Sequence, residues 1–365
     1  MGFNCGIVGL PNVGKSTLFN ALTESAAAEV ADYPFTTIEP NVGRVPVPDP
    51  RLSRIAAAGR CPKAVPTYLE FVDIAGLVRG ASEGEGLGNK FLAHIREVEA
   101  IAHILRCFEG EVTHVEGSVD PLHDAETVET ELLLADLESV ERQRDGALKR
   151  ARGGDKEAKA RLPLLEAVYE VLAAGRPARQ VAVASEQRRE LRRLHLLTAK
   201  PVLYVANVDE PAAATGNAYS DRVAARAEAL GAGFVVISVA IEAELAHLDD
   251  PAEKAEYLAS LGLEDTGLAR VIRAGYELLN LITFFSAGPK EARAWTVPRG
   301  TRAPRAAGEI HSDFERGFIR AETIACEDFV ALGGETGAKE AGKMRAEGRD
   351  YVVQDGDVIR FRFNV

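Results

Sequence analysis

The sequence predicts an α/β fold, in which a parallel sheet covered by helices carries a helical insertion and is followed by a small β-rich domain. Three observations support this expectation. Apolar runs alternate with helical patterns over the first 110 residues, and the alternation resumes after residue 200. Between about 125 and 200, apolar residues instead recur at spacings of three and four, which is typical of amphipathic helices. After residue 281, short β-like segments dominate.

Five apolar segments are expected to form the parallel sheet. Strands that alternate with helices form parallel sheets with both faces covered. The segments are Asn4–Leu10, Thr67–Ile74, Ala100–Cys107, Pro201–Val208 and Gly233–Val239.

The insertion is expected to be a helical hairpin. Gly153-Gly154 and Gly175-Arg176-Pro177 interrupt its helical pattern, as turn residues do. The periodic apolar residues are Leu133, Leu137, Val140, Leu162, Leu165, Val168 and Leu172. The exposed faces are expected to carry Arg142, Arg144, Lys149, Arg150, Arg152, Arg188, Arg189, Arg192 and Arg193.

Four segments after Leu281 are expected to be strands of the last domain. They are Thr283–Phe285, Ala294–Val297, Tyr351–Val353 and Val358–Phe363, with a tight turn at Asp355-Gly356-Asp357 between the last two. The sequence therefore predicts three parts: residues 1–125 together with 200–281, the insertion at 126–199, and residues 282–365.

Composition argues against several classes of protein. The 365 residues, 46% apolar and 27% charged, fit a globular protein of two or three domains. No run of 18 apolar residues predicts a transmembrane helix, and the first residues do not resemble a signal peptide. The four cysteines are widely spaced, which predicts neither a zinc site nor a disulfide framework. We expect a cytoplasmic protein without a membrane partner.

Charge is distributed unevenly along the chain. The net charge is −12, yet residues 142–200 hold 15 Lys and Arg against 7 Asp and Glu, a net of +8. Residues 282–365 have a net charge of zero. A basic segment within an acidic chain is a candidate contact for nucleic acid, although a solvated helix face is the more ordinary explanation of a charge run.

A phosphate-binding loop is predicted at residues 9–16, which read GLPNVGKS and match G-x-x-x-x-G-K-[ST]. The motif follows a predicted strand and precedes a helical pattern, Thr17–Leu22. Lys15 is expected to neutralise charge on the β and γ phosphates of a nucleotide, and the Ser16 hydroxyl to bind Mg²⁺. Backbone N–H groups would surround the α and β phosphates. They belong to Asn12, Val13, Gly14, Lys15, Ser16 and Thr17.

A second part of this site is predicted where another strand ends. Asp73 follows an apolar run and is followed by Gly76, as a Mg²⁺-orienting carboxylate and a γ-phosphate-sensing amide require. Alternatively, Asp73 only caps the strand. Either Thr36 or Thr37 could complete the Mg²⁺ ligands, and spacing does not decide between them. Residues 32–44 and the glycine-rich residues 77–90 are expected to be switch loops that respond to the γ-phosphate.

The base is expected to be adenine. Guanine-specific proteins with this loop usually carry Asn-Lys-x-Asp after a later strand, whereas this chain reads Asn207-Val208-Asp209-Glu210. The longer Glu210 side chain should weaken guanine recognition, and Asn207 can both donate to and accept from adenine. The alternative is that Asn207 only holds the backbone of the phosphate loop.

The residue that activates water is not evident from this pattern. Leu77 occupies the position where Ras-like proteins have a water-orienting glutamine. His114, in a loop after the strand that ends at Cys107, is one candidate, and a solvated loop histidine is its alternative. Asn12 could instead recruit a monovalent cation such as K⁺, or only form hydrogen bonds within the loop.

These motifs together resemble the Obg-related P-loop proteins. The phosphate loop, Tyr33–Asn41, Asp73–Leu77 and the glycine-rich switch carry the resemblance. The NVDE sequence at 207–210 and YVVQDGDV at 351–358 narrow it to the YchF (Obg-like ATPase) family. The likeness runs from Gly6 to Val365.

This resemblance implies a Ras-like nucleotide domain, an inserted helical coiled coil and a C-terminal TGS domain of β-grasp fold. It also implies ATP hydrolysis and association with the ribosome. Carried over by position, Ser16 and Thr36 would bind Mg²⁺, and Asn207 and Val208 would contact the base. The family's loop histidine, implicated in hydrolysis, falls on His114.

The resulting hypothesis is a monomeric, Mg²⁺-dependent ATPase that acts as a nucleotide-controlled switch in translation or stress response. The basic insertion would contact the large ribosomal subunit or the 70S ribosome. One alternative is a GTPase in ribosome assembly. Another is a binding module in which nucleotide controls partner affinity and hydrolysis is incidental.

Overall fold

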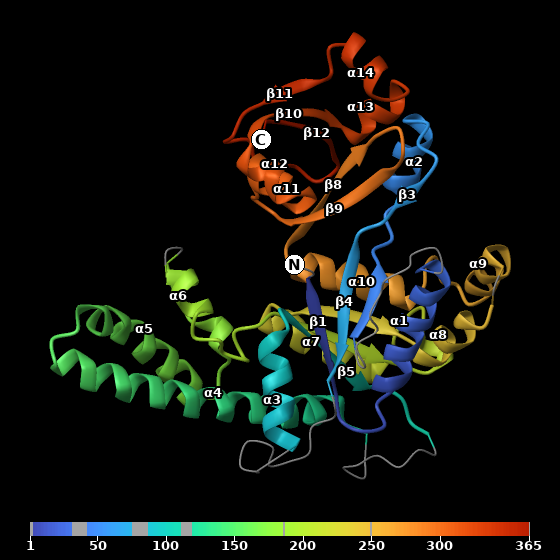
Figure 1. Cartoon of the computed structure of the whole chain (residues 1–365). Coiled ribbons are helices and arrows are strands. Elements are labelled where there is room, and N and C mark those ends of the chain that lie inside the picture. The colour runs from blue at the N-terminus through green and yellow to red at the C-terminus, as the bar shows by residue number, and fades with distance from the viewer. Residues whose placement is uncertain are drawn as a thin grey trace. The chain divides into compact units, whose positions relative to one another are not determined.

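The computed structural model describes residues 3–30, 42–74, 87–110, 119–184, 187–248 and 250–364 (Figure 1). Contacts divide the chain into two compact units. The first comprises Met1–Arg44 and Glu70–Gly275, and the second comprises Val45–Leu69 and Tyr276–Val365. Residues 45–69, predicted to belong to the nucleotide-binding part, instead pack with the C-terminal part of the chain.

A six-stranded sheet of order β2-β4-β1-β5-β6-β7 organises the first unit. The pairings β1–β4, β1–β5, β5–β6 and β6–β7 are parallel. The strands are β1 (Asn4–Val8), β2 (Val42–Pro46), β4 (Tyr68–Asp73), β5 (Ala100–Arg106), β6 (Val202–Asn207) and β7 (Gly233–Ile237). All five predicted strands are confirmed within two residues at each end.

Strand β2 was not predicted. Its sequence, VGRVP, combines glycine, proline and a charged residue with only two valines, so it lacks a clear apolar pattern. It lies at the edge of the sheet, where proline and exposed side chains are tolerated because one side of the strand needs no partner.

Helices of the first unit pack against this sheet and against one another. α4 contacts β5 and α7, α7 contacts β6 and β7, and α1 contacts β1 and α8. Outside the hairpin, the helices that include residues of this unit are α1 (Lys15–Val30), α3 (Leu87–Glu97), α6 (Arg188–Arg192), α7 (Ala218–Leu230), α8 (Val239–Ala246), α9 (Pro251–Ser260) and α10 (Gly267–Leu278). Two short 3₁₀ turns, Ala178–Gln180 and Glu210–Ala212, lie between them.

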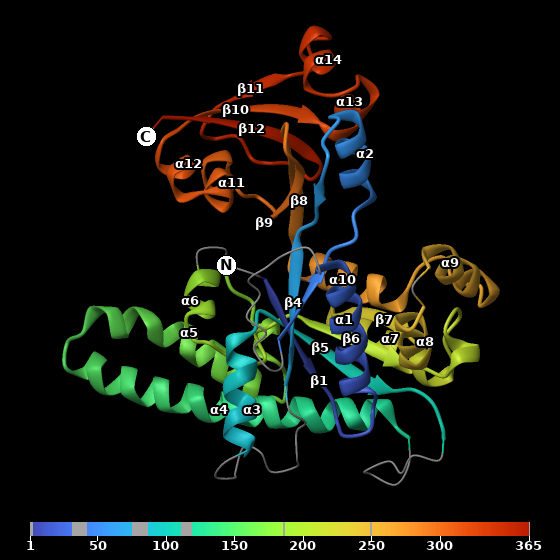
Figure 2. The ribbon, with the colours of Figure 1, turned by 45° about the vertical axis from the view of Figure 1, so that its right-hand side comes forward.

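The predicted helical hairpin is confirmed. It consists of α4 (Pro121–Arg152) and α5 (Lys156–Ala173), which lie side by side in Figures 1 and 2. Asp155 begins α5 by accepting hydrogen bonds from the backbone N–H groups of Glu157 and Ala158, which pairs two of the free amides at a helix start. The buried residues between the helices include Val140, Leu164, Leu165, Val168 and Leu172.

Buried Asp136 fastens the segment that follows the hairpin to α4. Its carboxylate accepts from the backbone N–H groups of Leu197 at 2.9 Å and Thr198 at 2.7 Å, and from the Thr198 hydroxyl at 2.7 Å. Burial raises the pKa of Asp136, and these hydrogen bonds oppose the rise. The hairpin is therefore tied at its base by a polar contact as well as by its apolar core.

The second unit is a mixed sheet of order β11-β10-β12-β8-β9-β3. A parallel pair, β12 and β8, lies in the middle and has antiparallel neighbours, the arrangement of a β-grasp fold. Its strands are β3 (Ala64–Val65), β8 (Leu281–Ala287), β9 (Ala292–Pro298), β10 (Phe318–Ala325), β11 (Arg345–Glu347) and β12 (Asp357–Phe363). Its helices are α2 (Pro50–Ala58), α11 (Ala303–Ile310), α12 (Ser312–Arg316), α13 (Cys326–Ala331) and α14 (Glu335–Glu340).

Helix α2 shows why residues 45–69 belong to this unit. Leu52 and Ile55 are buried in one cluster with Phe285 and Phe329. Asp49 begins the helix by accepting from the backbone N–H of Arg51 at 3.0 Å. Arg51 also donates to Asp355 at 2.7 Å across 304 residues of sequence. Both apolar packing and an ion pair therefore link this early segment to the end of the chain.

One predicted strand of the C-terminal domain is wrong. Val352 forms only an isolated bridge with Arg302, because the segment 351–353 pairs with the start of α11 rather than with β12. The carbonyl of Tyr351 accepts from Ala303 at 2.8 Å, and Val353 donates to Thr301 at 3.0 Å. The turn expected before the last strand is present, with Gly356 at φ 88°.

Strands β10 and β11 were missed. β10 reads FIRAETIA, in which charged residues obscure the β pattern. Glu322 accepts from Arg362 of the neighbouring strand β12 at 2.9 Å and from Arg320 of its own strand at 2.8 Å. No helix in the described part of the chain is long and apolar enough to cross a membrane.

Candidate functional site

The phosphate loop connects the end of β1 to the first residue of α1, Lys15. Asn12 and Gly14 have φ values of 65° and 97°, a left-handed conformation that glycine adopts without strain. A Cβ atom on Gly9 would lie 2.8 Å from the carbonyl oxygen of Ile104, so only glycine fits there. Ser16 and Thr17 are exposed at the start of the helix, where backbone N–H groups favour an anion.

Asn207, at the end of β6, holds this loop. Its side-chain nitrogen donates to the carbonyl oxygen of Val13 at 2.9 Å, and its oxygen accepts from the backbone N–H of Val239 at 3.0 Å. Asn207 is only 4% exposed. This contact corresponds to the alternative role that the sequence left open for Asn207, and the adenine contact stays a prediction.

Val208, the residue directly after β6, is also buried. It is 2% exposed, and its backbone N–H donates to the carbonyl of Ile237 at 2.8 Å. The neighbouring side chains of Asp209 and Glu210 are exposed. Any contact between Val208 and a base would therefore involve groups other than its N–H, and this contact too stays a prediction.

Lys15 and Asp73 bring the two predicted motifs together. The Lys15 ammonium group forms an ion pair with the Asp73 carboxylate. Asp73 is the last residue of β4 and pairs in register with Ile7 of β1, so both motifs lie at the edge where these parallel strands end. The side chains are 11% and 18% exposed, which leaves both groups largely shielded from water.

The groups at this edge fit Mg²⁺. A serine hydroxyl and a carboxylate are hard oxygen ligands, and Mg²⁺ in such sites takes its remaining ligands from phosphates and water. No group of three or more His, Cys, Asp or Glu side chains in the described ranges could hold a metal ion. A magnesium ion here would thus depend on Ser16, Asp73 and the bound nucleotide.

Several predicted site residues lie outside the described residues. They are Thr36, Gly76 and His114, together with most of both switch loops. The last parts of both predicted loops are regular instead. Residues 42–44 begin strand β2, and residues 87–90 form the first turn of α3. The glycine at position 88 favours a loop, but α3 begins at Leu87 and includes it.

Two groups that support the site were not predicted from the sequence. The backbone N–H of Val239, at the start of α8, holds Asn207. Asn217 caps α7 and also donates from its side chain to the carbonyl of Cys107 at 2.7 Å. The predicted parallel topology could have indicated both groups, because it places the ends of neighbouring strands, and the residues that follow them, at the same edge of the sheet.

The basic residues predicted on the insertion differ in their surroundings. Arg142 pairs with Glu138, Arg144 lies over the Tyr169 ring at 4.1 Å, and Arg193 pairs with Glu190 at 2.6 Å. The other six are exposed and form no ion pair with a described residue. They are Lys149, Arg150 and Arg152 at the end of α4, and Arg188, Arg189 and Arg192 on α6.

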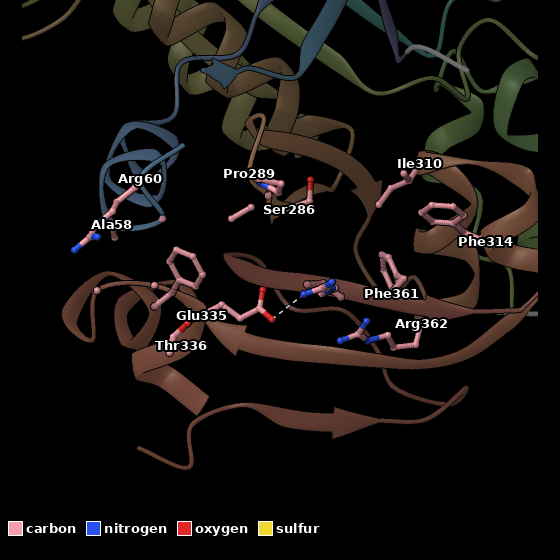
Figure 3. A pocket seen from close by; sticks show the side chains of 18 of the residues that line it. Ala58, Arg60, Ser286, Pro289, Ile310, Phe314, Glu335, Thr336, Phe361 and Arg362 are labelled. Carbon is pink, nitrogen blue, oxygen red and sulfur yellow. Dashed lines mark hydrogen bonds and ion pairs between the residues drawn. The ribbon is translucent and has the colours of Figure 1, made fainter. Parts of the chain in front are cut away.

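The second unit contains an open cavity of about 880 Å³ between the end of β8 and strand β12 (Figure 3). Its lining includes Phe314, Phe361 and Arg362, which Figure 3 labels, together with Arg360 of β12. Arg360 pairs with Glu335 at 3.1 Å, and Arg362 pairs with Glu322 at 2.9 Å. Each of the two strand arginines therefore already has a carboxylate partner within the unit.

Comparison with known proteins assigns the family. Residues 4–136 match a family model described as 50S ribosome-binding GTPase. Residues 281–364 match the YchF-GTPase_C model, described as a protein of unknown function (DUF933).

Relatives match the chain over its whole length. Proteins named ribosome-binding ATPase YchF from Haemophilus influenzae and Bacillus subtilis are 58% and 54% identical, with 100% of each chain covered. The structure of the Schizosaccharomyces pombe YchF GTPase has a TM-score of 0.89 at 37% identity, covering 99% of this chain and 98% of that one. A GTP binding protein from Pyrococcus horikoshii OT3 shares the fold, with a TM-score of 0.62 at 20% identity over 99% and 100% of the two chains. The chain belongs to the YchF family.

Proposed function

We propose that this chain binds and hydrolyses ATP with Mg²⁺ and acts on the ribosome as a nucleotide-controlled switch. The ion pair between Lys15 of the phosphate loop and Asp73 at the end of β4 carries the proposal. It joins the phosphate-binding and metal-orienting motifs at one edge of the sheet. The names of the H. influenzae and B. subtilis relatives, ribosome-binding ATPase YchF, support the substrate and the partner.

Catalysis would consist of positioning and charge neutralisation, as phosphoryl transfer requires. Lys15 would exchange its contact with Asp73 for the β and γ phosphates, while the amides at the start of α1 hold the α and β phosphates. Mg²⁺, held by Ser16 and Asp73 and by Thr36 in the triphosphate state, would supply positive charge to the phosphates. Asn12 is the candidate to recruit K⁺ beside them.

Hydrolysis by the isolated protein is expected to be slow. Leu77 cannot orient a water molecule, because its side chain has no polar atom. We propose that His114 helps to position the attacking water and that Gly76 senses the γ-phosphate through its backbone N–H. The switch segments would then report the state of the nucleotide to the helical insertion.

The ribosome contact is proposed for the basic end of α4. Lys149, Arg150 and Arg152 are exposed and have no ion pair with a described residue. Basic groups of this kind bind phosphate backbones by releasing condensed counterions. We propose that they contact RNA of the large subunit or the 70S ribosome, and that the chain does so as a monomer in the cytoplasm.

A GTPase in ribosome assembly is the main alternative. The nitrogen and oxygen of the buried Asn207 amide each have a backbone partner, which removes the argument for adenine that rested on that side chain. The S. pombe relative is called a GTPase. In a further alternative, nucleotide controls partner binding and hydrolysis is incidental.

Calorimetric titration of the nucleotide-free protein with ATP and with GTP, in Mg²⁺ and either K⁺ or Na⁺, tests the proposal. We expect ATP to bind at least tenfold more tightly, a difference of about 1.4 kcal/mol. Equal or tighter binding of GTP would contradict the ATPase assignment. Identical hydrolysis rates in K⁺ and Na⁺ would exclude the role proposed for K⁺.

A further inference from the structure

A second cavity, of about 430 Å³, lies in the first unit at the base of the hairpin. Its lining comes from β1, β5, β6, α4, α7 and the segment after α5, and includes no residue of the phosphate loop. Apolar side chains form much of its wall, among them Val8, Ile101, Leu132 and Val202. The cavity is large enough for a small organic molecule, since ligand pockets begin at roughly 300 Å³.

Two polar side chains of this wall lack adequate partners. His103 is 2% exposed, and its Nε2 atom has no hydrogen-bond partner. The Nε atom of Arg179 has none either, and its Nη1 atom reaches the carbonyl of Thr198 only at 3.5 Å. Arg179 forms no ion pair with any described residue. Buried polar groups are normally paired, so this arrangement calls for a ligand.

Both carboxylates of the cavity have partners. Arg226 contacts Glu129 at 2.7 Å and Glu126 at 3.2 Å, and the Tyr204 hydroxyl donates to Glu129. Arg179 forms no ion pair with a described residue, although Glu129 lies close enough to favour its charged form. In the C-terminal cavity, by contrast, Arg360 and Arg362 are each paired with a glutamate.

We propose that this cavity binds a small organic anion, a carboxylate or phosphate monoester with an apolar body. Its charged oxygens would accept hydrogen bonds from the Arg179 guanidinium and from Nε2–H of neutral His103. Its apolar body would lie against Val8, Ile101 and Val202. Burial lowers the pKa of His103 to about 4, which keeps the ring neutral at pH 7.

Such a ligand would connect the sheet to the insertion. His103 belongs to β5, whereas Arg179 follows α5. The segment that carries Arg179 is itself tied to Thr198, whose hydroxyl accepts from the backbone N–H of Ala178 at 3.0 Å. Binding would therefore stiffen the junction between the nucleotide-binding sheet and the helical hairpin.

Titration of the full-length protein with benzoate, phenyl phosphate and benzamide tests the proposal. The protein is first saturated with Mg²⁺ and ADP, so that the phosphate loop is filled and does not compete for anions. We expect one of the anions or both to bind, and neutral benzamide to bind at least about tenfold more weakly than the better anion. The ratio between benzoate and phenyl phosphate distinguishes a carboxylate site from a phosphate site.

Arg179→Met removes the proposed counterion and should weaken anion binding at least about tenfold. Arg142→Met is the matched control, because Arg142 is an exposed arginine on the hairpin, and it should leave binding unchanged. Equal affinity for benzoate and benzamide, or unchanged anion binding in Arg179→Met, would overturn the proposal. Failure of both anions to bind the wild-type protein at about 10 mM would do the same.

A measurement on the wild-type protein tests the proposal even if the variant does not fold. In protein labelled with ¹⁵N-histidine, the Nε2 resonance of His103 should shift on addition of the anion that binds and stay in place with benzamide. An anion that binds without moving this resonance would show that it occupies a different site, which contradicts the proposal.

Discussion

Asn207 donates from its side-chain nitrogen to the carbonyl oxygen of Val13, 194 residues earlier in the chain, at 2.9 Å. A Cβ atom on the adjacent Gly14 would lie 2.5 Å from that nitrogen, so the phosphate loop packs too closely against the end of β6 to admit a side chain at position 14. The contact assigns Asn207 a structural role in the phosphate loop. It leaves recognition of the base to be measured.

Asn207→Ala should weaken ATP and GTP binding by the same factor. The substitution leaves the Val13 carbonyl and the Val239 N–H without partners in a buried region, which costs about 1–3 kcal/mol for each group. Calorimetry with both nucleotides measures the effect, and urea unfolding measures the loss of stability. A loss confined to ATP would instead identify Asn207 as the adenine contact.

The role of Asn207 illustrates what the sequence could and could not predict. The apolar strands and the GLPNVGKS motif follow local patterns, so their position was predictable. The Asn207 contact depends on how closely a loop approaches a strand end far along the chain, and no local pattern encodes that distance. The same limit applies to Leu52 and Ile55, whose partners Phe285 and Phe329 lie more than two hundred residues away.

Asp73→Asn should separate metal binding from phosphate binding. The change removes the carboxylate charge that we assign to Mg²⁺ but frees Lys15 for the phosphates. We expect Mg²⁺-free ATP to bind at least as tightly as in the wild type, the Mg²⁺ concentration for half-maximal activity to rise, and kcat to fall by roughly 100-fold. Glu70→Gln, on the same strand β4, is the control. An unchanged Mg²⁺ dependence in Asp73→Asn would remove Asp73 from the metal site.

His114→Ala should lower kcat without changing ATP affinity. A group that positions the attacking water contributes only once the nucleotide is bound, and losses of about 100-fold are typical for such groups. His123→Ala, an exposed histidine in the first turn of α4, is the matched control. If His114→Ala hydrolyses poorly but supports full cellular function, hydrolysis is incidental and the binding-module alternative is correct.

Reversing the charge at the end of α4 should weaken ribosome binding. In the triple variant Lys149→Glu, Arg150→Glu and Arg152→Glu, we expect reduced co-sedimentation with 70S ribosomes and a shallower dependence on salt. Each lost phosphate contact removes about one unit from the slope of log K against log salt concentration. Nucleotide affinity should be unchanged, since these residues lie at the far end of a 32-residue helix from its N-terminus. A wild-type salt slope in the variant would place the RNA contact elsewhere.

His103→Gln should flatten the pH dependence of stability between about pH 6.5 and pH 4. Burial lowers the pKa of His103 to about 4, with a smaller opposing effect of Glu129 and a smaller reinforcing effect of Arg226. The unfolded chain has a histidine pKa of about 6.5. In this window the unfolded state therefore binds a proton that the folded state does not, so the free energy of unfolding of the wild type falls as the pH falls.

The difference between the two pKa values corresponds to about 3 kcal/mol. Because glutamine does not titrate, the variant lacks the pH-dependent contribution of His103 to the free energy of unfolding. Buried carboxylates such as Asp136 contribute equally to both proteins, so their contributions cancel in the comparison. The gap between the wild-type and variant unfolding free energies should be constant above about pH 7 and shift by about 3 kcal/mol in favour of the variant by pH 4. Urea unfolding at a series of pH values measures the gap. Parallel curves would mean that His103 is protonated in the folded state as readily as in the unfolded chain, and that its ring is not the neutral group that faces the cavity.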